Sequence, residues 1–145
     1  MPFFDNDALF PQPNFDDQDF WTSCDNRHLK FQCCAKCLQA RHPPTPVCPN
    51  CNSFNVAWKE TNGLGVVYTF TVVHHASHEA VKPNLPYVVA VIVFDDVPGV
   101  RWVSNITDAP LESIHIGLKV EIWWDEITPG RNIPRCRPYK GVTLK

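Results

Sequence analysis

Cysteine is the residue type in this chain whose spacing points most directly to chemistry. Seven cysteines occur in 145 residues, and five of them fall within positions 33–51. Two C-x2-C pairs lie there, ten residues apart: Cys34 with Cys37, and Cys48 with Cys51. Zn²⁺ prefers four soft ligands in a tetrahedron, and each short pair supplies two thiolates. The spacing therefore predicts one zinc ion per chain, bound by these four cysteines.

The other three cysteines have different expected roles. Cys33 would form C-x3-C with Cys37 and is a competing ligand, although the symmetry of the two pairs favours Cys34. Four thiolates close the coordination shell, which predicts a structural metal and not a catalytic one. Cys24 and Cys136 are most simply buried core thiols. Because the N-terminus does not have the pattern of a secretory signal, we expect a cytoplasmic protein. The reducing cytosol disfavours disulfides, so clustered cysteines suggest metal binding.

Charge and hydropathy restrict the possible partners. Thirteen Lys and Arg residues oppose fifteen Asp and Glu residues, for a formal net charge of -2. Such a chain is a poor candidate for a nucleic-acid binder, because phosphate neutralisation dominates that affinity. No segment reaches the roughly 18 apolar residues of a membrane span, and MPFFDNDALF lacks the basic flank and apolar core of a secretory signal. We expect neither nucleic acid nor a membrane as partner.

Two segments precede the cysteine pairs. Residues 1–13 are acidic, rich in Phe and interrupted by Pro, so they either pack back on the domain or form an arm for a partner. We predict that this arm is mobile in the isolated chain, since no adjacent element covers its apolar residues. From Asn14 to His28 there is no Pro or Gly, and Asn14 is a credible N-cap. An amphipathic helix of about four turns is predicted within residues 14–30.

The hydrophobic period changes to two from Gly65 onward. Residues 66–73, 87–94, 100–106, 118–127 and 133–139 are predicted strands, with a short helix at 108–115, a polar loop at 74–86 and a turn at 95–99. Pro134 and Pro138 make the last strand an edge or irregular strand. Five strands with a helix between the third and fourth is the order of an OB-fold barrel, whereas an immunoglobulin-like sandwich needs about seven. We predict a mainly β protein: helix, zinc ribbon at 31–58, and a five-stranded OB-fold at 59–145.

The stretch FQCCAKCLQARHPPTPVCPNC, followed by GVVYTFTVVHHA, PYVVAVIVFDD and IGLKVEIWW, resembles one protein family. Its members are acyl-CoA-associated OB-fold proteins with an N-terminal rubredoxin-like zinc ribbon, long catalogued as a domain of unknown function. The likeness covers residues 15–140 and leaves residues 1–13 outside. It implies zinc ligation by the two C-x2-C pairs. It also implies a thiolase-fold, lipid-transfer-protein-like partner subunit in a heterotetramer with two copies of each chain.

The resemblance also implies a function by association with that partner. The family's catalytic residues sit on the thiolase-fold chain, so no catalytic residue transfers to this sequence, and we expect no activity of the chain alone. The complex is expected to be an aldolase that cleaves the side chain of a 17-hydroxysteroid acyl-CoA, in steroid or bile-acid catabolism. A subunit of an acyl-CoA condensing, acyltransferase or hydratase complex is the alternative. An OB-fold nucleic-acid binder and a small self-sufficient enzyme are further alternatives.

Three other residue groups are candidate sites. The cluster His74, His75 and His78 fits acid–base chemistry or a second metal, but a polar loop at the barrel rim is the favoured interpretation. Because loop ends of a barrel face partners and ligands, these histidines are also possible channel or interface residues. The bases near the C-terminus could bind CoA phosphates, keep an edge strand soluble, or dock an acidic partner. These bases are Arg131, Arg135, Arg137 and Lys140. Trp102 and Trp124 are possible channel or interface residues, and Trp123 and Trp124 are expected on opposite faces of their strand.

Overall fold

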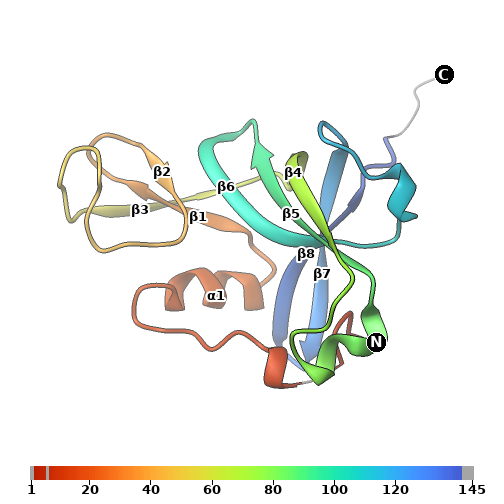
Figure 1. Cartoon of the computed structure of the whole chain (residues 1–145). Helices are drawn as coiled ribbons and strands as arrows, with labels where there is room; N and C mark the ends of the chain where they lie inside the picture. The colour runs from red at the N-terminus through yellow and green to blue at the C-terminus, as the bar shows by residue number, and fades with distance from the viewer. Residues whose placement is uncertain (1, 6, 142–145) are drawn as a thin grey trace.

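The computed structural model describes residues 2–5 and 7–141, and they form two sheets and one α-helix (Figure 1). A three-stranded sheet has the order β2-β1-β3, and a closed barrel has the order β4-β5-β6-β8-β7. The elements are α1 (Gln18–Asp25), β1 (Lys30–Cys34), β2 (Ala40–Arg41), β3 (Val56–Glu60), β4 (Leu64–Val73), β5 (Tyr87–Phe94), β6 (Val97–Ile106), β7 (Lys119–Thr128) and β8 (Arg131–Pro138), with 3-10 helices at Asp7–Leu9, Glu79–Asn84 and Leu111–Ser113. The predicted mainly β fold of helix, ribbon and five-stranded barrel is confirmed. No helix of the described residues is long and apolar enough to cross a membrane.

The barrel follows from strands with a period of two. In β5 every second residue, from Val88 to Phe94, is buried, while the residues between them are half-buried on the outer face. β4, β5 and β6 form one antiparallel meander, and β7 pairs with β8 in an antiparallel hairpin. The barrel closes where β6 meets β8 in parallel, through a single registered pair, Ile106 with Cys136.

The junction between β6 and β8, here called the seam, is held mainly by isolated hydrogen bonds. β8 lies between β6 and β7 in the closed barrel, so the prediction of an edge strand is wrong. The alternative prediction of an irregular strand agrees with its single registered pair with β6. The bonds across the seam are Ser104 Oγ to Pro134 O at 3.0 Å, Arg135 Nη1 to Asn105 Oδ1 at 2.7 Å, and Thr107 N to Cys136 O at 2.8 Å.

Helix, ribbon and barrel share one apolar core. A row of rings runs from α1 through β1 into the barrel: Phe20 and Phe31 have centroids 6.3 Å apart, Phe31 and Phe94 5.5 Å, and Phe94 and Trp102 5.9 Å. The ribbon therefore packs on the barrel through its first strand. Trp102 is buried in this row, so its predicted role at an interface or channel is wrong.

Cys24 and Cys136 lie in the same core, as predicted. Burial raises the pKa of each thiol to about 12, so neither is a thiolate at neutral pH.

The helix is shorter than the sequence predicted. The prediction that Asn14 is the N-cap is wrong: the N-cap of α1 is Asp17. The Asn14 side-chain oxygen instead accepts hydrogen bonds from the backbone N–H groups of Asp16 and Asp17, at 2.8 and 3.1 Å, and closes the turn before the helix. Residues 15–17 form this turn, and regular helix begins only at Gln18. The helix ends before Arg27, whose positive φ of 61° breaks the helical path. Two turns of helix are enough to bring Phe20 and Cys24 onto the core.

The connections also differ in detail from the prediction. The turn between β5 and β6 is limited to Asp95 and Asp96, because residues 97–99 already belong to β6. The predicted helix at 108–115 is reduced to the 3-10 helix of 111–113, and the loop of 74–86 contains the 3-10 helix of 79–84. The Asp96 carboxylate accepts hydrogen bonds from Thr61 Oγ1 at 2.8 Å and Asn62 N at 2.6 Å, which fixes the link from the ribbon into the barrel.

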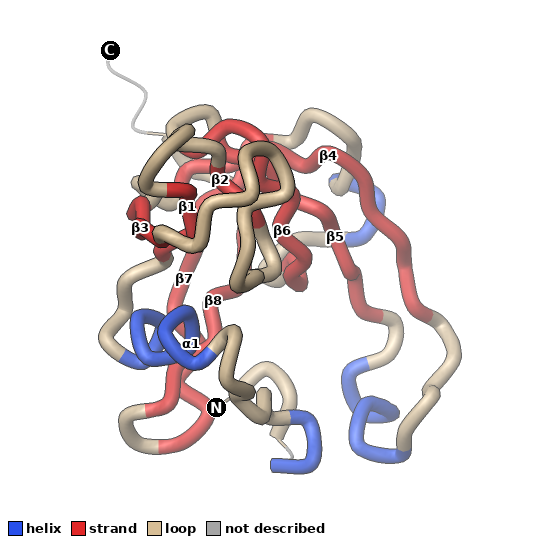
Figure 2. The backbone as a smooth tube through the Cα atoms, turned by 90° about the vertical axis from the view of Figure 1, so that its left-hand side faces the viewer, coloured by secondary structure: helices blue, strands red, loops and turns tan. Residues whose placement is uncertain are grey.

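The N-terminal segment packs back on the barrel, at the end where the 3-10 helix of 79–84 lies (Figures 1 and 2). The Phe3 N–H points at the Asp125 carboxylate, 3.1 Å from Oδ2, and the Asn84 side chain donates to the Phe3 carbonyl. The Phe4 ring meets Tyr87 edge to face, with centroids 5.2 Å apart. The expectation that no element covers the arm is therefore wrong for these two Phe residues. Met1 and Asn6 lie outside the described residues.

Candidate functional site

The four predicted zinc ligands converge at the tip of the ribbon. The sulfur atoms of Cys34, Cys37, Cys48 and Cys51 all lie within 4.8 Å of one another. Cys34 and Cys51 are 3.5 Å apart, and Cys37 and Cys48 are 3.6 Å apart. A tetrahedral Zn²⁺ with Zn–S bonds of about 2.3 Å needs sulfur atoms roughly 3.8 Å apart. The four cysteines are thus positioned to bind a metal.

Both cysteine pairs have the same local fold. The carbonyl of the first cysteine in each pair accepts a hydrogen bond from the N–H four residues later, Leu38 for Cys34 and Asn52 for Cys48, both at 2.9 Å. In each turn the residue that donates this hydrogen bond has a left-handed backbone conformation, with φ of 66° at Leu38 and 60° at Asn52. The repeated geometry turns both thiols of each pair toward the shared centre.

The electrostatics of the cluster favour a bound cation. The backbone N–H groups of Cys37 and Lys36 point at the Cys34 sulfur, each at 3.4 Å, and the Cys37 N–H is the main reason that the pKa of Cys34 falls to about 6. At Cys51 the Ser53 N–H lowers the pKa, but burial and the three neighbouring thiols outweigh it and raise the pKa to about 11. Four crowded thiolates repel one another, and a divalent cation would remove that repulsion.

Cys33 lies outside the cluster. Successive side chains of β1 alternate in direction, so Cys33 points into the core, where its thiol lies 3.7 Å from the Phe31 carbonyl. The structure therefore brings Cys34, and not Cys33, to the other three thiols.

Arg135 does not fit its predicted role as a ligand of CoA phosphates. Its side chain is 6% exposed, and its Nε donates to Asp125 Oδ2 at 2.6 Å. Nη1 donates to Asn105 Oδ1, and the rings of Phe3 and Phe4 lie 5.2 and 5.3 Å from the guanidinium carbon. This prediction is wrong, because the guanidinium closes the barrel and lies beneath the N-terminal segment.

The other three predicted phosphate ligands do not converge on one site. Arg131 lies 3.3 Å from an Asp25 carboxylate oxygen, and Arg137 donates to Glu121 at 3.1 Å. Lys140 shares a hollow of about 280 Å³ with the Arg137–Glu121 pair. Residues 131–145 contain five bases and no acid. In the fold, α1 and β7 supply the acidic partners, Asp25 and Glu121. Phosphate binding at Arg131, Arg137 and Lys140 stays a prediction.

The histidine cluster lies at the surface of the loop after β4. His74, His75 and His78 are exposed, and His78 Nδ1 accepts a hydrogen bond from Ala80 N at 3.1 Å, capping the 3-10 helix. Within residues 2–5 and 7–141, the four cysteines form the one group of metal-ligating side chains close enough to share an ion. The arrangement agrees with a polar rim of the barrel.

The tryptophans of β7 are both half-buried. Trp124 packs against the core, and Trp123 Nε1 donates to Thr107 Oγ1 at 2.9 Å. The two residues were expected on opposite faces of the strand, and neither face leaves its Trp fully buried or fully exposed. Trp124 contributes to packing, and an interface role for it stays a prediction.

Sequence reasoning missed two strongly exposed aromatic residues. Phe15 is 94% exposed and Phe54 is 74% exposed. Phe54 follows the second cysteine pair by three residues, and Phe15 opens the turn before α1. A large apolar residue in a segment too short to cover it was the available signal.

Comparison with known proteins identifies the family. Residues 21–57 match the model of the ChsH2 rubredoxin-like zinc ribbon domain, and residues 58–125 match that of the ChsH2 C-terminal OB-fold domain. The solved structure of the Ltp2-ChsH2(DUF35) aldolase superposes with a TM-score of 0.80 at 37% identity, over 89% of this chain and 98% of that chain. The chain belongs to the DUF35 family. The resemblance given by the sequence is thus confirmed.

Two longer relatives carry hydratase names. This DUF35 chain is 39% identical over 133 residues to the probable enoyl-CoA hydratase alpha subunit of Thermomonospora curvata. It is 30% identical over 117 residues to the 3-oxo-4,17-pregnadiene-20-carboxyl-CoA hydratase alpha subunit of Mycobacterium tuberculosis. The chain spans 40% and 36% of the length of these two relatives.

Proposed function

We propose that this DUF35 chain is the small subunit of an acyl-CoA aldolase whose partner is a thiolase-fold, Ltp2-type subunit. The observation that carries the proposal is the match to the Ltp2-ChsH2(DUF35) aldolase, which extends over 98% of that chain. The proposed complex contains two copies of each subunit. It cleaves the side chain of a 17-hydroxysteroid acyl-CoA into a ketone and a short acyl-CoA. We place it in the cytoplasm, because seven unpaired cysteines suit a reducing compartment.

The steroid thioester is proposed as substrate on two grounds. The sequence resemblance implies a side-chain aldolase, and the name of the Mycobacterium tuberculosis relative contains a pregnadiene carboxyl-CoA. Both point to a steroid carboxylic acid carried on CoA. The substrate would bind mainly to the partner subunit.

The proposed metal is one structural Zn²⁺ per chain, bound by Cys34, Cys37, Cys48 and Cys51. Four thiolates fill a tetrahedral shell and leave no position for substrate, so the ion would stabilise the ribbon. The ribbon needs this support because its second strand has only two residues, Ala40–Arg41, and its third is largely exposed. A segment with so small a core is commonly held together by a metal.

Catalysis is assigned to the partner. Retro-aldol cleavage requires a base for the 17-hydroxyl and stabilisation of the enolate that leaves. The histidines after β4 are exposed, and Nδ1 of His78, which lines an open hollow of about 360 Å³, is engaged in a local cap. The roles proposed for this chain are to stabilise the larger subunit and to help wall the acyl-CoA channel.

A hydratase complex is the second candidate function. It is favoured by the names of the two longer relatives and by the 39% identity to one of them. However, more than half of each relative has no counterpart in this chain. A subunit of a condensing or acyltransferase complex is a further alternative, based on the sequence resemblance alone.

The test is an assay of each subunit separately and of both together. The chain and the Ltp2-type protein of the same organism are incubated with a 17-hydroxysteroid acyl-CoA, and release of the ketone and the short acyl-CoA is followed. We expect turnover only from the pair. Turnover by the DUF35 chain alone would contradict the subunit role and would make the histidine cluster a catalytic candidate. A pair that hydrates enoyl-CoA, or condenses simple acyl-CoAs, and ignores the steroid thioester would reject the aldolase assignment.

A further inference from the structure

A groove of about 370 Å³ separates the start of α1 from the zinc ribbon. Trp58 and Val56 of β3 line it, together with Gln18, Gln32, Thr45 and Pro46. One wall carries Phe15 together with Asp16 and Asp19, and the other wall carries Phe54. The groove thus combines apolar and aromatic side chains with acidic and neutral polar ones.

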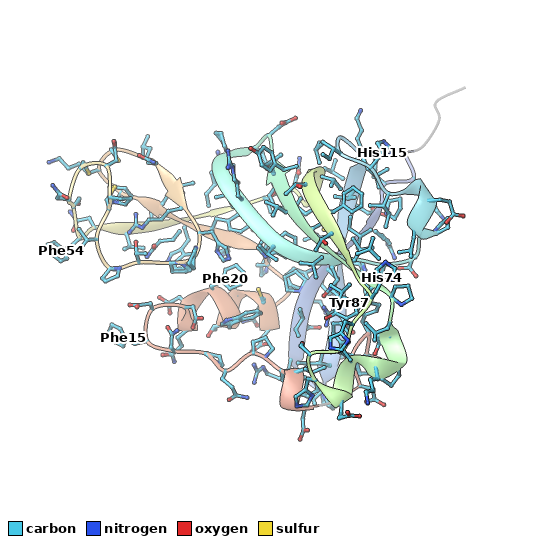
Figure 3. The ribbon with its side chains drawn as sticks, viewed as in Figure 1. Phe15, Phe20, Phe54, His74, Tyr87 and His115 are labelled. Atoms are coloured by element: carbon cyan, nitrogen blue, oxygen red, sulfur yellow. The ribbon has the colours of Figure 1, made fainter. Side chains whose placement is uncertain are left out.

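The two aromatic walls are held at the same side of the molecule. Figure 3 shows Phe15 and Phe54 both pointing outward from the end of the molecule opposite His115. Burying a Phe side chain contributes about 1.5–3 kcal/mol, so two Phe side chains left in water mark an unfilled contact surface. Val56, which also lines the groove, is exposed too.

The backbone beneath Phe54 is fixed on both sides. The Ser53 carbonyl accepts from Cys48 N and the Asn55 carbonyl accepts from Ala35 N, both at 2.9 Å. Phe54 is therefore an exposed side chain on a rigid turn, tied to both cysteine pairs. An aromatic anchor held in this way loses little conformational entropy on binding.

The charge of the groove defines what it can bind. Asp17 is engaged within the chain, accepting from Asn14 N and Trp21 Nε1. Among the described residues, Asp16 and Asp19 make no ion pair, and both are exposed. The first 25 residues contain six acids and no base. Charge complementarity therefore calls for a cationic occupant.

We propose that this groove docks a segment of the Ltp2-type partner subunit. The segment presents an apolar side chain to Trp58 and Val56, between Phe15 and Phe54. A flanking Lys or Arg of the partner faces the acidic wall. The inference rests on the proposed function, since it names the surface through which the two subunits meet. Membrane association is not favoured, because the acidic wall would repel an anionic lipid surface.

The experiment compares two groove variants with a matched control. Phe15→Ser and Phe54→Ser each remove one aromatic wall. Ile116→Ser removes a similarly exposed apolar side chain, 66% exposed, which follows His115 in the sequence; His115 lies at the other end of the molecule. The Kd for the purified Ltp2-type protein is measured by calorimetry, with melting temperature and zinc content checked for every variant. We expect each groove variant to bind at least tenfold more weakly, as for truncation of an interfacial aromatic anchor, and the control to stay within twofold.

A charge reversal tests the acidic wall separately. Asp19→Lys is compared with Glu112→Lys, which alters an exposed acid on the 3-10 helix of 111–113. Reversal in the groove is expected to slow association severalfold and to weaken its dependence on salt, and the control is expected to leave both unchanged. Because Phe15 and Asp19 lie outside the cysteine pairs, these variants keep the test valid if Phe54→Ser fails to fold.

Each outcome supports or overturns the inference. Wild-type binding with equal affinity in the groove variants would overturn this inference and leave the proposed function standing. No binding of the wild type to the Ltp2-type protein would overturn both. Loss of self-association of the isolated chain in the groove variants, with unchanged partner binding, would assign the groove to a second copy and overturn the inference.

Discussion

Replacing Asp125 by Asn should strongly lower the free energy of unfolding, because it breaks a buried ion pair. The Asp125–Arg135 pair is 2.6 Å long, with side chains 2% and 6% exposed. The substitution leaves the guanidinium buried without a counter-charge and weakens the acceptor of the Phe3 N–H. Breaking a buried pair from one side costs about 3–5 kcal/mol. At this chain length that is a fall in Tm of roughly 10–20 °C.

A matched pair on the same hairpin provides the control. Arg137 and Glu121 also join β8 to β7 through an Arg Nε and a carboxylate oxygen, at 3.1 Å, but their side chains are 46% and 31% exposed. Glu121→Gln should therefore cost no more than about 1 kcal/mol. The two substitutions remove the same charge from the same strand, so burial is the difference between them.

The assay is urea unfolding of zinc-loaded protein, with the m-value compared across variants to confirm that only stability has changed. Arg135→Met combined with Asp125→Asn should recover part of the loss, since it removes the uncompensated charge. A cost of Asp125→Asn below about 1 kcal/mol, or equal to that of Glu121→Gln, would refute the assignment of a buried ion pair that closes the barrel.

Three further predictions concern the metal, pH and the N-terminal segment. Cys34→Ser should lose both its zinc, measured by elemental analysis, and its binding to the partner, whereas Cys33→Ser should keep one zinc per chain. Wild-type protein that is folded and reduced but contains no metal would contradict this. Burial lowers the pKa of His42 from 6.5 to about 4, although Asp17 acts in the opposite direction. As the pH falls, His42 is therefore protonated in the unfolded chain before it is protonated in the folded one. Stability should then fall as pH drops from 6.5 toward 4, and unfolding midpoints of His42→Gln at pH 7 and 5 should show a smaller decrease. Deleting residues 1–5 should cost about 1–2 kcal/mol in the same unfolding assay, since it removes the Phe3 hydrogen bonds; no change would show that the segment is not packed in solution.

The features that the sequence predicted are local ones. The cysteine pairs set their own turns within a few residues, and the alternation of β5 requires only a period of two. Local signals also located the polar turn before α1, but they placed the N-cap three residues too early: the Asn14–Asp17 bonds close that turn, and the helix is capped at Asp17 and begins at Gln18.

The features that it missed depend on register. Asp125 and Arg135 are ten residues apart, but in the β7–β8 ladder Asp125 faces Ile133 and Arg135 faces Trp123, with a register shift between Glu126 and Thr128. No count along the sequence reveals that bulge, so Arg135 was grouped with its exposed neighbours. The exposure of Phe15 and Phe54 depends on how the ribbon and α1 pack, which local patterns do not report.

The β6–β8 seam has a consequence for the kinetics of the barrel. Long antiparallel ladders join β4 to β5, β5 to β6 and β7 to β8, and a shorter antiparallel ladder joins β4 to β7. A single backbone pair and a few isolated bonds join β6 to β8. Parting these two strands breaks the fewest hydrogen bonds, so transient opening should begin there and the Thr107 amide should exchange early. The pairings of β4 with β7 and of β6 with β8 are expected to form late in folding, because these strands are distant in sequence. A subunit that binds only the closed barrel would lower the population of the open form, so assembly would protect the chain from proteolysis even where no contact covers the cleavage site.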